Sequence, residues 1–209
     1  MADDRRAERE ALVDRLTDRR DLSSATEQAM RAVPRHAFVP SDRQTAAYDD
    51  SPLPIGEGQT ISAPHMVAVM TDLLDADEGD RVLEVGTGCG YHAAVTAELV
   101  GADPVYSVEY HDSLAREARK TLRKTGYEAV SVRAGDGREG WPAHAPYDRA
   151  YLTCAAPTVP AAVVEQVRPG GLVLAPVGEQ TQTLVRARKR ADGTVDRERH
   201  GGVRFVPLQ

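Results

Sequence analysis

The chain has 209 residues, enough for one sizeable domain, and a formal net charge of −6, which leaves no basic surface for duplex nucleic acid. Its two cysteines and six histidines offer neither a disulfide framework nor the spacing of a zinc site, so we expect no metal ion. The N-terminus has no apolar signal core and no apolar run approaches the ~18 residues of a membrane span, which predicts a cytoplasmic protein, expected to be a monomer, without a membrane partner.

Two short helices are expected at the N-terminal end. Residues 5–19 form a polar amphipathic pattern with a thin apolar stripe at Leu12, Val13 and Leu16. A second helix over residues 26–33 would end at Pro34, because the residue before a proline disfavours the helical conformation. Its inward-facing side chains are expected to be Ala25, Ala29, Met30 and Val33. Both helices are interpreted as a cap on a larger domain.

Residues 34–63 are interpreted as a long irregular loop, because prolines and glycines recur in it too often for a helix. Loops of this length in a compact domain tend to be functional. Within it, Asp49 and Asp50 are interpreted as a solvated turn, since adjacent side chains of an extended chain point apart. A helix then starts at Pro64, which suits the first helical position. Its buried face is predicted from apolar spacing to be Met66, Val69, Met70, Leu73 and Leu74.

From residue 81 onward the pattern alternates between short apolar strands and helices. Strands are predicted at residues 82–85, 105–109, 130–133, 148–153 and 172–176, and helices at 91–99, 111–124 and 160–167. Repeated strand–helix units predict an α/β fold with a doubly wound, mainly parallel sheet, and alternation after residue 182 predicts antiparallel edge strands. We expect one domain, 1–209, with a helical cap and substrate loop (1–63), a cofactor-binding core (64–180) and C-terminal edge strands (181–209).

A glycine-rich turn follows the first strand of this core. Gly86, Gly88 and Gly90 stand between the strand and the next helix, whose free N–H groups favour an anionic ligand group. Position 91 is Tyr, so the turn does not fit the dinucleotide pattern G-x-G-x-x-G. With Glu84 supplying an acid, and Thr87 inside the turn, it resembles the S-adenosylmethionine loop of Rossmann-like methyltransferases. By itself, the turn could also be a junction whose glycines serve packing alone.

Two further strand ends carry acidic residues. Glu109 ends the second strand, and its two carboxylate oxygens can accept hydrogen bonds from both hydroxyls of a ribose. Asp136 and Gly137 follow the third strand, where a carboxylate and a backbone N–H can read an adenine ring. Taken singly, Glu109 could be a solvated acid at a helix start, and the Asp136 segment an ordinary turn. Their order at consecutive strand ends favours a cofactor site.

Segments outside the glycine turn narrow the resemblance. Residues 52–62 (PLPIGEGQTIS) followed by a helix, residues 34–40 (PRHAFVP), and the later segments 135–137, 145–148, 155–160 and 203–208 occur in the order found in protein-L-isoaspartate O-methyltransferases. The similarity covers roughly residues 26–208, and the Gln-Thr-Ile-Ser segment is its most specific part. Cys89 and His92 depart from it, since the family often has Ser and Gln at these positions.

The resemblance implies an activity and a set of site residues. Enzymes of this family transfer a methyl group from S-adenosylmethionine to the free carboxylate of L-isoaspartyl residues in aged proteins, and the ester then cyclises to a succinimide, which allows repair. The resemblance also places Thr60, Ile61, Ser62 and His65 around the substrate, with Ser62 as the active-site residue. The edge at Val203 and Phe205 is also expected near the substrate backbone, and the partners are isoaspartyl-containing proteins and peptides.

This chemistry needs few catalytic groups. A carboxylate nucleophile is ionised at neutral pH because its pKa lies near ~4, so no general base is required. Holding two reactants in line can supply roughly 7–11 kcal/mol. Ser62 would position one carboxylate oxygen, although a serine before a helix is also a common cap. Two other readings stay open: a methyltransferase for small molecules or RNA on the same fold, and a module that binds damaged proteins without turnover.

Overall fold

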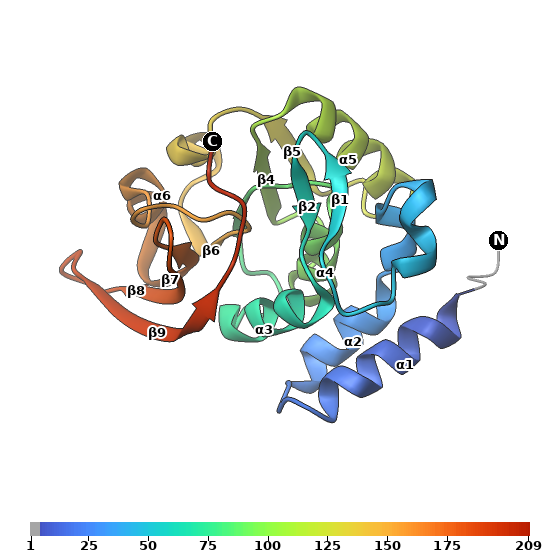
Figure 1. The fold of residues 1–209 in the computed structure, drawn as a ribbon. Coiled ribbons are helices and arrows are strands. Elements are labelled where there is room, and N and C mark those ends of the chain that lie inside the picture. The colour runs from blue at the N-terminus through green and yellow to red at the C-terminus, as the bar shows by residue number, and fades with distance from the viewer. Residues whose placement is uncertain (1–4) are drawn as a thin grey trace.

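The computed structural model describes residues 5–209, so the first four residues of the charged N-terminal stretch lie outside the described part. Its centre is a seven-stranded sheet in the order β5-β4-β3-β6-β7-β8-β9 (Figure 1). Strands β5, β4, β3, β6 and β7 run parallel to one another, and β8 and β9 are antiparallel. The predicted α/β fold with antiparallel C-terminal strands is confirmed. The strands are β3 (Val82–Val85), β4 (Val105–Glu109), β5 (Ser131–Ala134), β6 (Tyr147–Leu152), β7 (Val167–Val177), β8 (Gln182–Lys189) and β9 (Val195–Val203).

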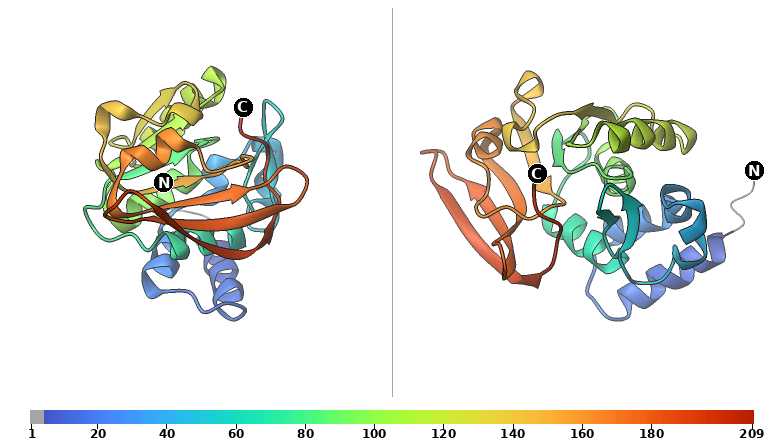
Figure 2. Two further views of the ribbon diagram at one scale, coloured as in Figure 1. Left: turned by 90° about the vertical axis from the view of Figure 1, so that its left-hand side faces the viewer. Right: turned by 45° about the horizontal axis from the view of Figure 1, so that its top comes forward.

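Helices cover both faces of the sheet, as parallel strands require. Every residue of β3 is buried, and one apolar core joins the sheet to α1, α2, α3 (Pro64–Leu74) and α4 (Tyr91–Val100). The second core lies against α6 (Ala161–Gln166). Helix α5 (Asp112–Lys124) packs on β4 and β5. Figure 2 shows β8 and β9 crossing one side of the molecule, away from the N-terminal helices.

The N-terminal helices are α1 (Arg6–Thr17) and α2 (Ser24–Ala32). Helix α2 starts two residues earlier than predicted because the side chain of Ser23 accepts a hydrogen bond from the Thr26 backbone N–H. Its buried face contains Thr26, Ala29 and Met30, whereas Ala25 is exposed, so the inward orientation predicted for Ala25 was wrong. The helix ends before Pro34, as expected.

The region predicted as an irregular loop contains regular structure. Short 3₁₀ helices span Arg35–Phe38 and Ser41–Ala46, and a hairpin joins β1 (Leu53–Gly56) to β2 (Gln59–Ile61). The hairpin turn needs three consecutive residues with positive φ, 99° at Gly56, 51° at Glu57 and 70° at Gly58. These strands were not predicted for two reasons. Each strand is too short to show an alternating pattern, and prolines in and around β1 argued against a strand.

Two other expectations need correction. The fully buried residues of α3 include Val67, Met70 and Leu74, while Met66, Val69 and Leu73 are only half-buried, so the buried face is rotated from the predicted one. Strand β7 begins at Val167, five residues earlier than expected, and its pairing with β6 shifts register before Arg149. None of the helices in residues 5–209 is long and apolar enough to cross a membrane.

Candidate active site

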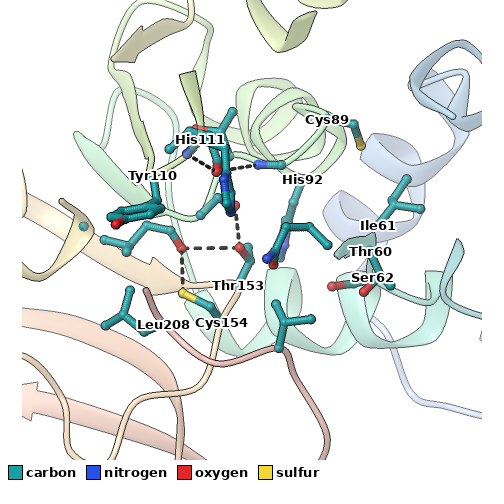
Figure 3. Close-up of a pocket in the computed structure, with 18 of the residues that line it drawn as sticks. Thr60, Ile61, Ser62, Cys89, His92, Tyr110, His111, Thr153, Cys154 and Leu208 are labelled. Atoms are coloured by element: carbon teal, nitrogen blue, oxygen red, sulfur yellow. Dashed lines mark hydrogen bonds between the residues drawn. The ribbon is translucent and has the colours of Figure 1, made fainter. Parts of the chain in front are cut away.

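A pocket opens at the carboxyl ends of β3, β4 and β6, where open α/β sheets bind ligands. One wall comes from the loop after β3, the end of β4 and the residues after β6. The opposite wall comes from the β1–β2 hairpin, and the C-terminal tail closes a third side (Figure 3). The residues that line it on these three sides include Gln59–Ser62, Gly86–Cys89, Glu109–His111, Gly137, Thr153, Cys154 and Val206–Gln209.

The glycines of the β3 turn have different tasks. Gly86 has a φ of 97°, and a Cβ there would lie 2.3 Å from the Thr153 hydroxyl oxygen. Gly88 has a φ of 55° and lines the pocket beside it. Gly90 does not line the pocket: it precedes α4, and a Cβ there would lie 3.2 Å from Leu122. Gly86 and Gly88 therefore bring bare backbone to the pocket, whereas Gly90 packs against Leu122.

Glu109 connects the end of β4 to the glycine turn. It is only 4% exposed, and its two carboxylate oxygens accept hydrogen bonds from the Gly88 N–H at 2.8 Å and the His111 N–H at 3.0 Å. A carboxylate has about four acceptor positions, so two remain for hydroxyls that enter the pocket. This arrangement fits the ribose of the expected cofactor. The exposed ring of Tyr110, which sequence reasoning missed, stands at the pocket beside it.

The Asp136 segment meets the pocket through its backbone. Gly137 lines the pocket, and a Cβ there would lie 2.4 Å from Val85, so only glycine fits. The Asp136 carboxylate turns toward Arg138 instead, with its Oδ2 accepting from the guanidinium at 2.6 Å. That hydrogen bond holds the pKa of Asp136 below its usual value. Asp136 does not itself line the pocket.

Glu84 also lies outside the pocket lining, beneath the glycine turn. Its side chain is fully buried and is hydrogen-bonded to the Ser107 hydroxyl and to the Tyr151 hydroxyl, the latter at 2.9 Å. Burial raises the pKa of this carboxyl to about 8. The sequence pattern had suggested that Glu84 contacts a ligand directly. In the structure its side chain does not reach the pocket.

The hairpin wall carries the predicted substrate residues. Thr60, Ile61 and Ser62 all line the pocket. Helix α3 is capped at Ala63 without a side-chain hydrogen bond, so Ser62 is not its cap. Within residues 5–209 the Ser62 hydroxyl has no hydrogen-bond partner from the protein, which leaves it free for a ligand.

Arg35 holds this wall from behind and was missed as a functional residue. Its side chain is fully buried and donates hydrogen bonds to the backbone carbonyls of Ala47, Ser51 (3.2 Å) and Ser62 (3.0 Å). A buried guanidinium that satisfies three separate segments fixes their relative positions. Its place in the Pro34–Pro40 motif was the only sequence signal.

His65 lies beside the site but not in it. Its ring Nδ1 is 2.8 Å from Asp50 Oδ1, and its backbone N–H donates to the same oxygen at 2.9 Å. Asp50 lies in an exposed bend, as expected, and its carboxylate is also a partner of His65 at the start of α3. His65 is not among the residues that line the pocket.

The C-terminal residues that reach the pocket differ from those predicted. Val203 ends β9 and Phe205 lies just beyond it, and neither lines the pocket. The next four residues, Val206–Gln209, do. The Gln182 side chain fixes this tail, because it accepts from the Phe205 N–H at 2.6 Å and donates to the Phe205 carbonyl at 3.1 Å.

Three further lining residues carry no reactive charge. Burial raises the pKa of the Cys89 thiol to about 11 and of the Cys154 thiol to about 12, so both stay protonated. Burial lowers the pKa of His92 to about 3, which keeps its imidazole neutral. Within the described chain, no group of His, Cys, Asp and Glu side chains could hold a metal ion. These three lining residues therefore offer hydrogen bonds and shape rather than a thiolate or an imidazolium.

Comparisons with known proteins agree with this geometry. A family model described as protein-L-isoaspartate(D-aspartate) O-methyltransferase matches residues 7–209. Protein-L-isoaspartate O-methyltransferase 2 of Archaeoglobus fulgidus is 53% identical over 202 residues, covering 96% of this chain and 92% of that protein. The protein-L-isoaspartate O-methyltransferase of Methanopyrus kandleri is 54% identical, covering 100% of this chain and 95% of that protein.

Solved structures support the same assignment. One titled protein-L-isoaspartate O-methyltransferase superposes with a TM-score of 0.88 at 30% identity, covering 96% of this chain and 66% of that longer chain. A putative protein-L-isoaspartate O-methyltransferase from Plasmodium falciparum, in complex with S-adenosyl-L-homocysteine, has a TM-score of 0.84 at 22% identity, covering 96% of this chain and 98% of that one; it shows the shared fold. The chain belongs to the protein-L-isoaspartate(D-aspartate) O-methyltransferase family.

Proposed function

We propose that this pocket binds S-adenosylmethionine along the ends of β3 and β4 and presents an isoaspartyl carboxylate to it at Ser62. The activity is that of the family: methylation of the free carboxylate of L-isoaspartyl residues in damaged proteins and peptides, which leads to repair through a succinimide. The observation that carries this assignment is the unpartnered Ser62 hydroxyl, which lines the same pocket as the glycine turn.

When bound, S-adenosylmethionine supplies a transferable methyl group on a positively charged sulfur. The chain's own residues hold the rest of that molecule. Glu109 would accept hydrogen bonds from the ribose hydroxyls, Tyr110 would offer a ring face to the adenine base, and the backbone at Gly137 would border that base. Thr87, Gly86 and Gly88, which line the pocket together, would hold the amino-acid end of the cofactor. Asp136 can accept from the adenine amino group only through acceptor positions that Arg138 leaves free.

On the substrate side, the protein needs to position the isoaspartyl carboxylate and does not need to activate it. The isoaspartyl carboxylate is ionised at neutral pH, so no base has to remove a proton. Ser62 donates a hydrogen bond to one of its oxygens, and Thr60 and Ile61 border the adjoining peptide. Arg35 maintains the position of Ser62 through the Ser62 carbonyl. Alignment of the two reactants can supply roughly 7–11 kcal/mol of the barrier reduction.

Selectivity tests this proposal. An isoaspartyl residue differs from an aspartyl residue by one methylene moved from the side chain to the main chain. The enzyme is incubated with methyl-labelled S-adenosylmethionine and matched isoaspartyl and aspartyl peptides, and the labelled methanol that base hydrolysis releases from the methyl ester is counted. We expect methylation of the isoaspartyl peptides across varied neighbouring residues and strong rejection of the aspartyl peptides. Comparable methylation of both would favour a different substrate on the same fold.

We also propose that the protein acts as a cytoplasmic monomer without a nucleic-acid or membrane partner. In support, the formal net charge of −6 disfavours a polyanion. Light scattering during size-exclusion chromatography measures the mass directly, and a dimer mass would contradict this assignment.

A further inference from the structure

Three neighbouring strands place polar side chains directly opposite one another in the buried sheet. Glu84 of β3 is paired with Ser107 of β4 on one side and with Tyr151 of β6 on the other. Each of the three is 0% exposed. The Glu84 carboxyl is hydrogen-bonded to the hydroxyls of both partners. A carboxyl group therefore sits at the centre of the sheet, directly beneath the cofactor turn.

This buried cluster is connected to the pocket. The Ser107 hydroxyl also lies 2.5 Å from the hydroxyl of Thr87, which is 4% exposed and lines the pocket. At the far end, the Tyr151 hydroxyl lies 2.9 Å from Thr96 of α4. A continuous chain of hydroxyl groups thus leads from Glu84 through Ser107 to the pocket.

Among the described residues, no cation compensates the charge of an ionised Glu84. In residues 5–209 no Lys, Arg or His forms an ion pair or hydrogen bond with it. The titratable groups that face it are Glu109 from β4, which has the same sign, Tyr151 from β6, and the thiols of Cys89 and Cys154. His92 of α4 packs against the Tyr151 ring, with the two ring centroids 4.5 Å apart. Burial, with a smaller contribution from Glu109, raises the pKa of Glu84 to about 8.

We propose that Glu84 is a neutral carboxylic acid in the free enzyme and ionises when the positively charged sulfur of S-adenosylmethionine enters the pocket, so that Glu84 becomes its buried counter-charge. The inference rests on the proposed cofactor site. It makes Glu84 a positioning residue that acts through Thr87 and through charge, without contact to the ligand.

The proton can leave along the hydroxyl chain. The O–H bond of Glu84 breaks as its proton passes to Ser107, Ser107 passes its own proton to Thr87, and Thr87 releases one to solvent in the pocket. Each hydroxyl gives one proton and receives one, so only Glu84 changes charge. Afterwards Thr87 donates inward to Ser107 and Ser107 donates to the Glu84 carboxylate. The demethylated product has no charge on its sulfur, so Glu84 takes its proton back when the product is bound.

Calorimetric proton counting tests the inference. Binding of S-adenosylmethionine and of S-adenosylhomocysteine is titrated at pH 7 in two buffers of different ionisation enthalpy. The protein is compared with Glu84→Gln, whose amide can keep both hydrogen bonds. It is also compared with Thr96→Val, which removes the hydroxyl bonded to Tyr151 and leaves Glu84 and its two partners in place. Both ligands carry an α-amino group whose pKa lies close to the pH of the experiment, so it also exchanges protons with the buffer. The proton count of the Glu84→Gln protein contains this contribution alone and is subtracted.

We expect the native protein to release about 0.9 proton more than Glu84→Gln on binding S-adenosylmethionine, given a pKa of about 8. The excess should nearly vanish for S-adenosylhomocysteine, and Thr96→Val should behave as the native protein. Equal proton counts in the native and Glu84→Gln proteins, or equal counts for the two ligands, would overturn the inference. Absence of any binding heat would contradict the proposed cofactor site and this inference with it.

A second measurement needs no variant. Infrared difference spectra of the native protein should lose the C=O band of a protonated carboxylic acid when S-adenosylmethionine is added. The band should persist with S-adenosylhomocysteine. A band that persists with both ligands shows that Glu84 does not ionise and overturns the inference, even if Glu84→Gln fails to fold.

Discussion

The two walls of the pocket are built in different ways. The cofactor wall consists of the ends of β3, β4 and β6, which are neighbours in register within one parallel sheet. The substrate wall consists of a hairpin and a chain terminus that belong to no common element. Single side chains from distant parts of the sequence hold this wall. Arg35 bonds to the Ser62 carbonyl, and Gln182 bonds to the tail at Phe205.

This difference indicates how each wall responds to change. On the cofactor wall the backbone itself does the positioning, so a change of backbone conformation should remove binding altogether. On the substrate wall a few side-chain hydrogen bonds position the binding residues. Removing one of these hydrogen bonds should therefore produce a partial loss of peptide turnover. The two walls should therefore be separable by mutation, which the following experiments examine.

Gly86→Ala should have the largest effect. The new Cβ would lie 2.3 Å from Thr153 at a φ of 97°, which strains any L side chain. We expect cofactor binding to become unmeasurable by calorimetry. Gly193→Ala is the matched control, because it has a φ of 83° with no atom near its Cβ, far from the pocket. Equal affinity in Gly86→Ala and the native protein would show that the turn tolerates a side chain.

Glu84 should make the cofactor wall sensitive to pH. Its folded-state pKa of about 8 exceeds an unfolded value near 4.5, so the folded protein retains a proton that the unfolded chain has lost. Its stabilising contribution is complete below pH ~4.5 and is lost as pH rises toward ~8, by a few kcal/mol at roughly 1.4 kcal/mol per pKa unit. Urea unfolding of the ligand-free protein should show this fall relative to Glu84→Gln. Parallel pH curves for the two proteins would contradict it.

Glu109→Ala should weaken cofactor affinity by about 1.5–3 kcal/mol, the range for hydrogen bonds to a charged group. It also removes the acceptor for the Gly88 N–H, so the turn loses support. Calorimetry with S-adenosylhomocysteine measures the change. Glu117→Ala serves as control, because that exposed carboxylate pairs with Lys120 on α5 and does not line the pocket. An affinity unchanged by Glu109→Ala would remove Glu109 from the site.

Ser62→Ala should lower peptide turnover about tenfold, since one hydrogen bond is worth about 1–1.5 kcal/mol, and should leave cofactor affinity unchanged. Ser41→Ala, in an exposed position outside the pocket, is the matched control. Methylation rate is measured per folded molecule. A loss confined to the melting temperature would give Ser62 a structural role only.

Gln182→Ala should have the smallest effect, a several-fold rise in the peptide KM, because it frees the tail at Phe205 but removes no side chain that lines the pocket. Gln182→Glu keeps the acceptor for the Phe205 N–H and loses the donor, so we expect an intermediate value. Steady-state kinetics over a peptide series gives both numbers. Identical KM values in all three proteins would exclude the tail from peptide binding.

The same contrast explains what could be predicted from the sequence. The bounds of β3 and β4 were predicted correctly because each is a short, mostly apolar run bounded by turn residues, as buried parallel strands are. Gly86, Gly88 and Glu109 followed, since strand ends in such a sheet meet at one edge. That the pocket has Thr60–Ser62 on its other wall depended on the family resemblance.

Other residues escaped prediction because their positions depend on distant contacts. Nothing local in the sequence indicates that Asp50 would bind His65, or that Gln182 would hold the backbone at Phe205. Glu84 was assigned to the ligand because it stands beside the turn in sequence. Its alternation within β3 instead points its carboxyl into the sheet, toward Ser107 and Tyr151.

The most direct test of a two-walled site is a crystal structure with S-adenosylhomocysteine and an isoaspartyl peptide bound together. We expect the ribose hydroxyls at Glu109, the isoaspartyl carboxylate within hydrogen-bond distance of the Ser62 hydroxyl, and the product sulfur between them in line with a carboxylate oxygen. A carboxylate bound away from Ser62, or a ribose bound away from Glu109, would contradict it.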